Sequence, residues 1–105
     1  MTASYHFSAN LLDQIKEIPP DSIISQTFFS GDQTKAILFG FAPGQELSEH
    51  TASRPAVLHF LEGRARISLG GDPFEVGPGA WVHMPAQMAH SIHAETRLVM
   101  LLMLL

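Results

Sequence analysis

Short runs of alternating apolar and polar residues recur along most of the chain. Gly, Pro or Asp interrupts them every eight to twelve residues, as at Pro43-Gly44, Gly70-Gly71-Asp72 and Gly77-Pro78-Gly79. In Arg64–Leu69 the period is strictly two, with Ala65, Ile67 and Leu69 on one face. Short strands separated by turn residues at this spacing are typical of all-β sandwiches and barrels.

We therefore expect an all-β fold with one short N-terminal helix. Asn10 can cap a helix of about two turns, whose apolar residues run from Leu11 to Ile18 before Pro19-Pro20 ends it. Glu46 and Glu49, beside His50, are expected to lie in a loop. The expected strands are Ile23–Phe29, Lys35–Phe41, Ala56–Leu61, Arg64–Leu69, Phe74–Val76, Ala80–Met84, His90–Ala94 and Arg97–Leu104.

Two local features lead to specific structural expectations. The run Leu98–Leu105 does not alternate, so both faces of its strand should be covered. Gly77-Pro78-Gly79 must turn sharply, and Gly79 is expected to adopt a positive φ that other residues tolerate poorly.

Composition restricts the classes of protein that remain. The chain has 105 residues, 46% hydrophobic and 15% charged, with a formal charge of −4 and no cysteine. This size predicts a single domain spanning residues 1–105. The absence of cysteine excludes disulfides and thiol catalysis, and the lack of a basic cluster argues against nucleic-acid binding.

Membrane insertion and export are not expected either. The apolar tail Leu98–Leu105 is far shorter than the roughly 20 residues of a spanning helix, and Met1–Phe7 lacks a basic region followed by an apolar run. A cytoplasmic location is therefore expected. Low charge, the apolar tail and exposed strand edges predict a homodimer.

Two spaced motifs occupy the middle of the chain. Gly44, His50 and Gly63 are followed by Gly79, Pro85 and His90, with a strand hairpin and a glycine-proline-glycine corner between them. In these spacings residues 44–94 resemble the cupin family of double-stranded β-helix barrels, also described as jelly rolls. The resemblance implies that fold, and it covers about half of the chain. Gln87 and Ala94 stand where the second family motif has Gly and Asn.

The resemblance also implies a metal site. Metal-binding cupins use two histidines and a glutamate of the first motif and one histidine of the second. His50 and His90 match, whereas Ala52 and Ala56 replace a histidine and the glutamate. Because two imidazoles alone make a weak site, a third ligand is needed.

His59 is the first candidate for that third ligand, although strict alternation would turn it away from the side of Leu58 and Phe60 unless a bulge intervenes. A divalent transition metal, Fe, Mn, Ni, Zn or Cu, is the cofactor that this hypothesis implies.

Three functions remain open at this point, and the sequence does not decide whether the protein is an enzyme. The first is a metal-dependent cupin enzyme that uses His50, His90 and a third group. The second is a metal-free module that binds a small molecule in an apolar barrel, enlarged by Ala52 and Ala56 and with two polar fixing points. The third is a histidine-based isomerase. Fold alone does not choose among them.

Overall fold

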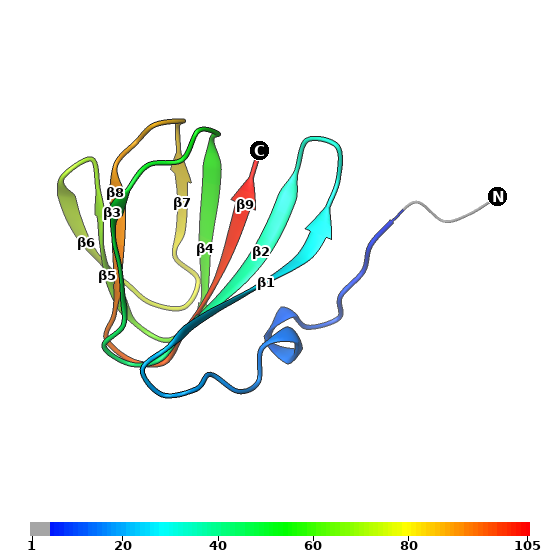
Figure 1. Cartoon of the computed structure of the whole chain (residues 1–105), viewed down its shortest axis with the longest axis horizontal. Helices are drawn as coiled ribbons and strands as arrows, with labels where there is room; N and C mark the ends of the chain where they lie inside the picture. Colours follow the sequence, from blue (N-terminus) through cyan, green and yellow to red (C-terminus); the bar gives the residue numbers. More distant parts are fainter. Residues whose placement is uncertain (1–4) are drawn as a thin grey trace.

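A computed structural model describes residues 5–105 and places them in two β-sheets that face each other (Figure 1). One turn of 3₁₀ helix, η1 (Leu11–Gln14), precedes the strands. The strands are β1 (Ile23–Ser30), β2 (Lys35–Phe41), β3 (Glu46–His50), β4 (Ala56–Glu62), β5 (Ala65–Leu69), β6 (Asp72–Val76), β7 (Trp81–Met84), β8 (His90–Ala94) and β9 (Leu98–Leu104).

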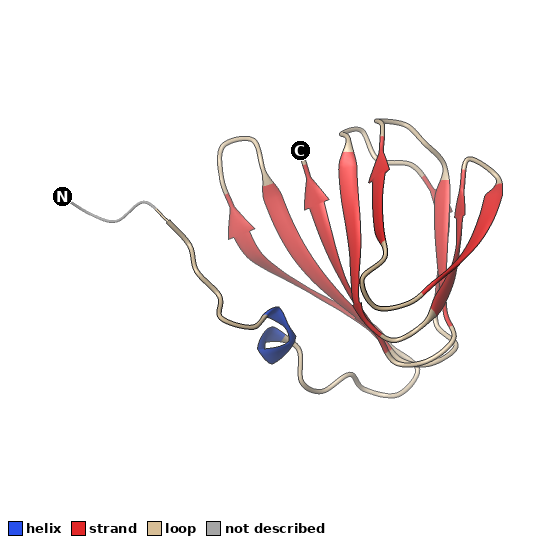
Figure 2. Ribbon diagram, turned by 180° about the vertical axis from the view of Figure 1, so that it is seen from behind, coloured by secondary structure: helices blue, strands red, loops and turns tan. Residues whose placement is uncertain are grey.

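The sheets have a jelly-roll topology. One sheet has the order β1-β2-β9-β4-β7 and the other the order β3-β8-β5-β6, and the paired strands are antiparallel. The chain passes repeatedly from one sheet to the other, as Figure 2 shows from behind. The all-β double-stranded β-helix expected from the sequence is confirmed.

The main core lies between the two sheets. Alternate residues of each strand point inward, and the largest of them, Phe41, Leu58, Phe60, Ile92 and Met100, are almost fully buried. Ala65 and Ile67 of β5 are buried as the two-residue period predicts, whereas Arg64 and Arg66 are exposed. Burial of apolar side chains between the sheets is the main favourable contribution to folding.

The first half of strand β9 is covered on both faces, as its non-alternating sequence predicts, whereas its residues from Leu101 onward are partly exposed. Leu98 and Met100 pack into the main core, whereas Val99 packs on the opposite face with Ile15 and Leu38. The N-terminal segment makes this second cluster possible. A Cβ on Gly40 would lie 2.7 Å from Ile18 Cδ1, so a side chain there would displace the segment.

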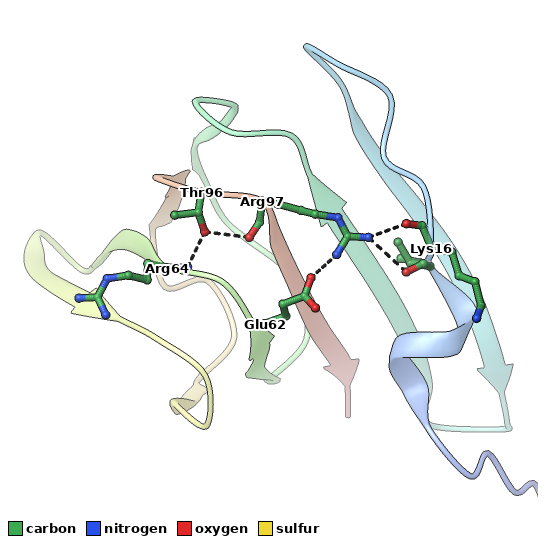
Figure 3. A network of polar contacts seen from close by, with 6 residues as sticks. Lys16, Glu62, Arg64, Thr96 and Arg97 are labelled. Atoms are coloured by element: carbon green, nitrogen blue, oxygen red, sulfur yellow. Dashed lines mark hydrogen bonds and ion pairs between the residues drawn. The ribbon is translucent and has the colours of Figure 1, made fainter.

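Arg97 links the N-terminal segment to the barrel through hydrogen bonds and an ion pair (Figure 3). Its guanidinium donates to the Lys16 carbonyl oxygen at 2.8 Å and to the Ile15 carbonyl oxygen, and it pairs with the Glu62 carboxylate. Thr96 Oγ1 accepts from the Arg64 backbone N–H at 3.0 Å and donates to the Arg97 carbonyl oxygen.

The short N-terminal helix expected from the sequence is present, but it has one 3₁₀ turn where about two turns were expected. The Asn10 side chain caps it, and it ends early because Ile15 is already extended and packs on the sheet. The segment Glu46–His50, expected as a loop, is strand β3. Within residues 5–105 no helix is long and apolar enough to cross a membrane.

Candidate functional site

His50 and His90 lie side by side at one end of the barrel. They are register partners on the adjacent strands β3 and β8. Their ring centroids are 4.2 Å apart, and the ring planes are inclined by 55°. The structure thus brings together the two histidines that stand at ligand positions of the two motifs.

A bulge in β3 turns His50 toward His90. Leu47 pairs with Ile92, and His50 pairs with His90, so three steps along β3 match two steps along β8. Strict alternation would place His50 on the face opposite to Leu47. The extra residue reverses that parity, so His50 shares the inward face of Leu47 and His90.

Both imidazoles have their Nδ1 atoms engaged by the backbone. His50 Nδ1 lies 2.8 Å from the Ser48 carbonyl oxygen, and His90 Nδ1 lies 3.0 Å from the Met88 carbonyl oxygen. Because a carbonyl oxygen only accepts hydrogen bonds, each Nδ1 must carry the proton. In the neutral ring Nε2 is then an unprotonated acceptor, so the pair offers two Nε2 lone pairs to a ligand.

The two rings differ in their access to solvent. His90 is buried, with 6% of its surface exposed, whereas His50 is exposed. The pair therefore lies at the mouth of the barrel, with His50 exposed to solvent and His90 buried. The backbone N–H of Gln87 donates to the Ala52 carbonyl oxygen at 2.8 Å and ties together the two loops beside this mouth.

The rest of this end of the barrel is apolar. Leu69 continues the row of His50 and His90 in the four-stranded sheet. In the facing sheet Met84, Ala56 and Leu104 form a row across β7, β4 and β9 and belong to the main core or pack on it. Ala56 stands where the family motif has its glutamate, so the facing row supplies no carboxylate.

A mainly apolar cavity of about 310 Å³ is lined by residues of β5, β6 and β7 and by Ala80 just before β7. Leu69, the register partner of His90, lines one side of it. A cavity of this size accommodates a small organic molecule. The lining residues are Ile67, Leu69, Phe74, Glu75, Val76, Ala80, Trp81 and Val82.

His59 does not join the pair. It lies on β4 between the inward residues Leu58 and Phe60, and its register partners on the neighbouring strands are Trp81 and Leu101. β4 has no bulge before His59, so alternation turns its side chain to the outer face. The structure therefore does not bring His59, the third ligand expected from the sequence, to the pair.

Other polar residues gather on the outer face of the four-stranded sheet. His93 Nδ1 lies 3.1 Å from Glu46 Oε1, and the Ser68 and Ser91 hydroxyl oxygens are 2.7 Å apart. These residues line a shallow hollow of about 490 Å³. Glu46 is thus directed away from the two histidines and is not available to them.

The residues present do not form the metal site that the resemblance implies. Residues 5–105 contain no group of three or more His, Cys, Asp or Glu side chains placed to hold one ion. The two Nε2 atoms are correctly oriented, because metal-ligating histidines commonly donate Nδ1–H to a backbone carbonyl. Two of the usual protein ligands are nevertheless missing.

Sequence reasoning missed two features of this site. The bulge that orients His50 could not be predicted from the sequence. Glu46–His50 is mostly polar, so it lacks the apolar alternation that would indicate the register of the strand. Gln87 adopts φ 69 and so occupies the left-handed region. The positive φ of Gln87 could have been predicted, because Gln87 stands where the second family motif has a glycine.

Comparison with known proteins identifies the family. The family model described as Cupin domain matches residues 37–104, which is more than half of the chain. The protein belongs to the cupin family. The comparison with curated protein sequences gave no significant match.

Solved structures agree with this assignment. A cupin superfamily protein from Desulfitobacterium hafniense superposes with a TM-score of 0.86 at 24% identity, covering 97% of this chain and 93% of its own. A conserved protein of unknown function from Streptococcus pyogenes gives 0.82 at 26% identity, with coverages of 97% and 90%. A cupin 2 conserved barrel domain protein from Leptotrichia buccalis gives 0.82 at 29%, covering 91% of this chain and 46% of its own.

Proposed function

We propose that this cupin is a binding module for a small, mainly apolar molecule that carries one O–H or N–H donor. The observations that support the proposal are the two Nε2 acceptors on adjacent rings and an apolar cavity whose lining residue Leu69 is the register partner of His90. The donor of the ligand bonds to Nε2 of His50 or His90, and its apolar body occupies the cavity beside Leu69.

The tautomers determine which ligands fit. A neutral imidazole with its proton on Nδ1 accepts at Nε2 and cannot donate there. A phenol, alcohol or amine therefore donates to one of the two Nε2 atoms, whereas a hydrocarbon of the same shape donates to neither. Such a loss typically costs about 1 kcal/mol, or roughly fivefold in affinity.

A metal ion is the second candidate occupant. The two Nδ1-to-carbonyl bonds support it, because they fix the orientation of metal-ligating imidazoles. An ion held by His50 and His90 takes its remaining ligands from elsewhere, since no third His or carboxylate converges there in residues 5–105. The metal-dependent enzyme and the histidine-based isomerase stay predictions of the sequence.

The proposed function is tested with a matched pair of probes, p-cresol and toluene, which differ by one hydroxyl group. Binding of each to the full chain is followed by ¹H–¹⁵N NMR titration. p-Cresol should bind about fivefold more tightly than toluene, and His50→Phe/His90→Phe should abolish that advantage, because phenylalanine keeps a ring but has no acceptor.

His59→Phe is the matched control for the probe pair, since His59 lies on the outer face, and it should leave the advantage intact. Equal affinities for p-cresol and toluene in the wild-type chain contradict the proposal. A higher affinity for p-cresol than for toluene that persists in His50→Phe/His90→Phe also contradicts the proposal.

We also propose that the chain pairs with a second copy. The support is an apolar outer face on the five-stranded sheet, where Ala36, Leu101 and Met103 line a hollow with Phe28 and Phe29. Trp81, at the other edge of the same sheet, is 62% exposed. Covering such a face against another chain removes apolar surface from water.

A further inference from the structure

Strand β3, which carries His50, has few contacts that fix its register. It is an edge strand of the four-stranded sheet, and in the described part of the chain it pairs with β8 alone. Leu47 is half-buried, and the other four residues of the strand are exposed. Burial of one face is what specifies the register of a strand, so a strand with so little buried surface is prone to slip along its neighbour.

The bulge in β3 makes the position of His50 depend on the start of the strand. The first two residues of β3 pair with β8, whereas Ser48 and Glu49 have no register partner. The pair of His50 with His90 follows them. The Ser48 carbonyl oxygen, which accepts from His50 Nδ1 at 2.8 Å, lies in this unpaired stretch. The direction of the His50 ring therefore depends on how firmly the start of β3 is held.

A side-chain hydrogen bond holds the first residue of β3. His93 Nδ1 lies 3.1 Å from Glu46 Oε1, and His93 donates because a carboxylate only accepts. The two residues are also register partners, so the bond runs directly across β3 and β8. Within residues 5–105 it is the one side-chain hydrogen bond that joins these two strands. Cross-strand pairs of this kind stabilise the pairing of the strands that carry them.

The neighbouring backbone bonds hold the chain ahead of β3. The Gly44 N–H donates to the Ala94 carbonyl oxygen at 2.8 Å, and the Ala94 N–H donates to the Gln45 carbonyl oxygen at 2.9 Å. Both bonds precede the first residue of the strand. Glu49, the other acidic residue of β3, is exposed and lies in the unpaired stretch. Glu46 is thus the acidic residue of β3 that is placed to fix its register.

We propose that Glu46 and His93 are positioning residues for the histidine pair, because their bond on the outer face holds the register of β3 and with it the ring of His50. The bond favours the arrangement in which the Ser48 carbonyl accepts from His50 Nδ1, and that arrangement leaves Nε2 free to accept from a ligand. The proposal rests on the proposed function, since it concerns the same Nε2 atom. Glu46 and His93 line the outer hollow and act only through the strand.

The test compares Glu46→Ala, which removes the acceptor, with Glu46→Gln, whose amide oxygen still accepts from His93. Glu49→Ala is the matched control, because it removes the same charge from an unpaired position of the same strand. Long-range ¹H–¹⁵N correlation measures the tautomers of the histidine rings, and amide hydrogen exchange measures the opening of β3. His90 is the internal reference, because β8 is paired on both sides.

Loss of one cross-strand pair shifts an equilibrium by about two- to fivefold. In Glu46→Ala we therefore expect the ratio of Nδ1–H to Nε2–H tautomers at His50 to fall by about that factor. Amide exchange in β3 should become faster by a similar factor. The tautomer ratio of His90 and amide exchange in β5 should stay at their wild-type values. Glu46→Gln and Glu49→Ala should match the wild type in all four measurements.

A wild-type tautomer ratio at His50 or wild-type exchange in β3 overturns the positioning role if Glu46→Ala shows either. Equal changes in Glu46→Gln or Glu49→Ala, or in β5 and His90, overturn it as well. These results leave the proposed function standing if p-cresol binds the wild type more tightly than toluene does. If the two probes bind equally while His50 responds to Glu46→Ala as expected, the small-molecule proposal fails and the positioning role stands.

Discussion

Gln87 and Ala52 join the two loops of the barrel mouth through one backbone hydrogen bond, from the Gln87 N–H to the Ala52 carbonyl oxygen at 2.8 Å. Gln87 makes this bond with φ 69, in the left-handed region that favours glycine. The cupin motif has glycine at this position. The chain thus accepts backbone strain beside its histidine pair.

Gln87→Gly should therefore stabilise the protein. Release of the strain contributes roughly 1–3 kcal/mol, and the greater freedom of glycine in the unfolded chain offsets about 0.4–1 kcal/mol of it. We expect a net gain of about 1 kcal/mol in the free energy of unfolding by denaturant titration. Gln87→Ala keeps the strain and should not show the gain. A lower free energy of unfolding for Gln87→Gly than for the wild type would contradict the assignment of backbone strain to Gln87.

Two glycines with positive φ should respond differently to alanine. At Gly79, φ 94, a Cβ meets no atom within 4 Å, so only conformational strain of about 1–3 kcal/mol opposes substitution. At Gly63, φ 90, a Cβ would lie 1.9 Å from the Arg97 carbonyl oxygen. Gly63→Ala should thus lower the free energy of unfolding more than Gly79→Ala. The reverse order in urea titrations would be inconsistent with this packing.

Loss of the Arg97 contacts should release the N-terminal segment. Arg97→Gln removes the ion pair with Glu62 and the donors to Ile15 and Lys16. Trypsin cuts after lysine, so cleavage after Lys16 should become faster, as mass spectrometry of timed digests can show. Arg64→Gln is the control, because the Arg64 side chain is exposed and takes no part in these contacts. Equal cleavage rates in wild type and Arg97→Gln would refute this role.

The proposed dimer predicts a doubled mass by light scattering at micromolar concentration. Leu101→Glu places a carboxylate on the apolar outer face and should convert the chain to a monomer, because an unpaired charge is costly to bury. Glu75→Gln, on an exposed position of β6, should leave the mass unchanged. A monomeric wild-type chain argues against the dimer.

Elements with strong apolar patterns could be predicted from the sequence. β2 and β8 have the expected bounds, the first half of β9 is covered on both faces, and Gly79 has its positive φ. Strand β3 was missed, because Glu46–His50 is polar and a bulge breaks its register. Its position depends on pairing with β8, forty or more residues later in the chain, and the local sequence does not indicate that pairing.

The candidate site, too, could be predicted only in part. The motif spacing located His50 and His90, because both histidines align with the ligand positions of the family. It did not show that Nδ1 of each ring bonds to a carbonyl, nor that Met84 and Ala56 are register partners in the other sheet. Those relationships arise only when the two sheets pack together, since they depend on backbone geometry and on cross-strand register.

Unprotonated Nε2 atoms on His50 and His90 are what both proposed ligands require. Long-range ¹H–¹⁵N correlation of the histidine side chains reports the tautomer of each ring directly. It is recorded at mildly alkaline pH, where imidazoles are neutral, and His50→Phe and His90→Phe assign the signals. We expect both rings to carry the proton on Nδ1. A proton on Nε2 of either ring would contradict the site.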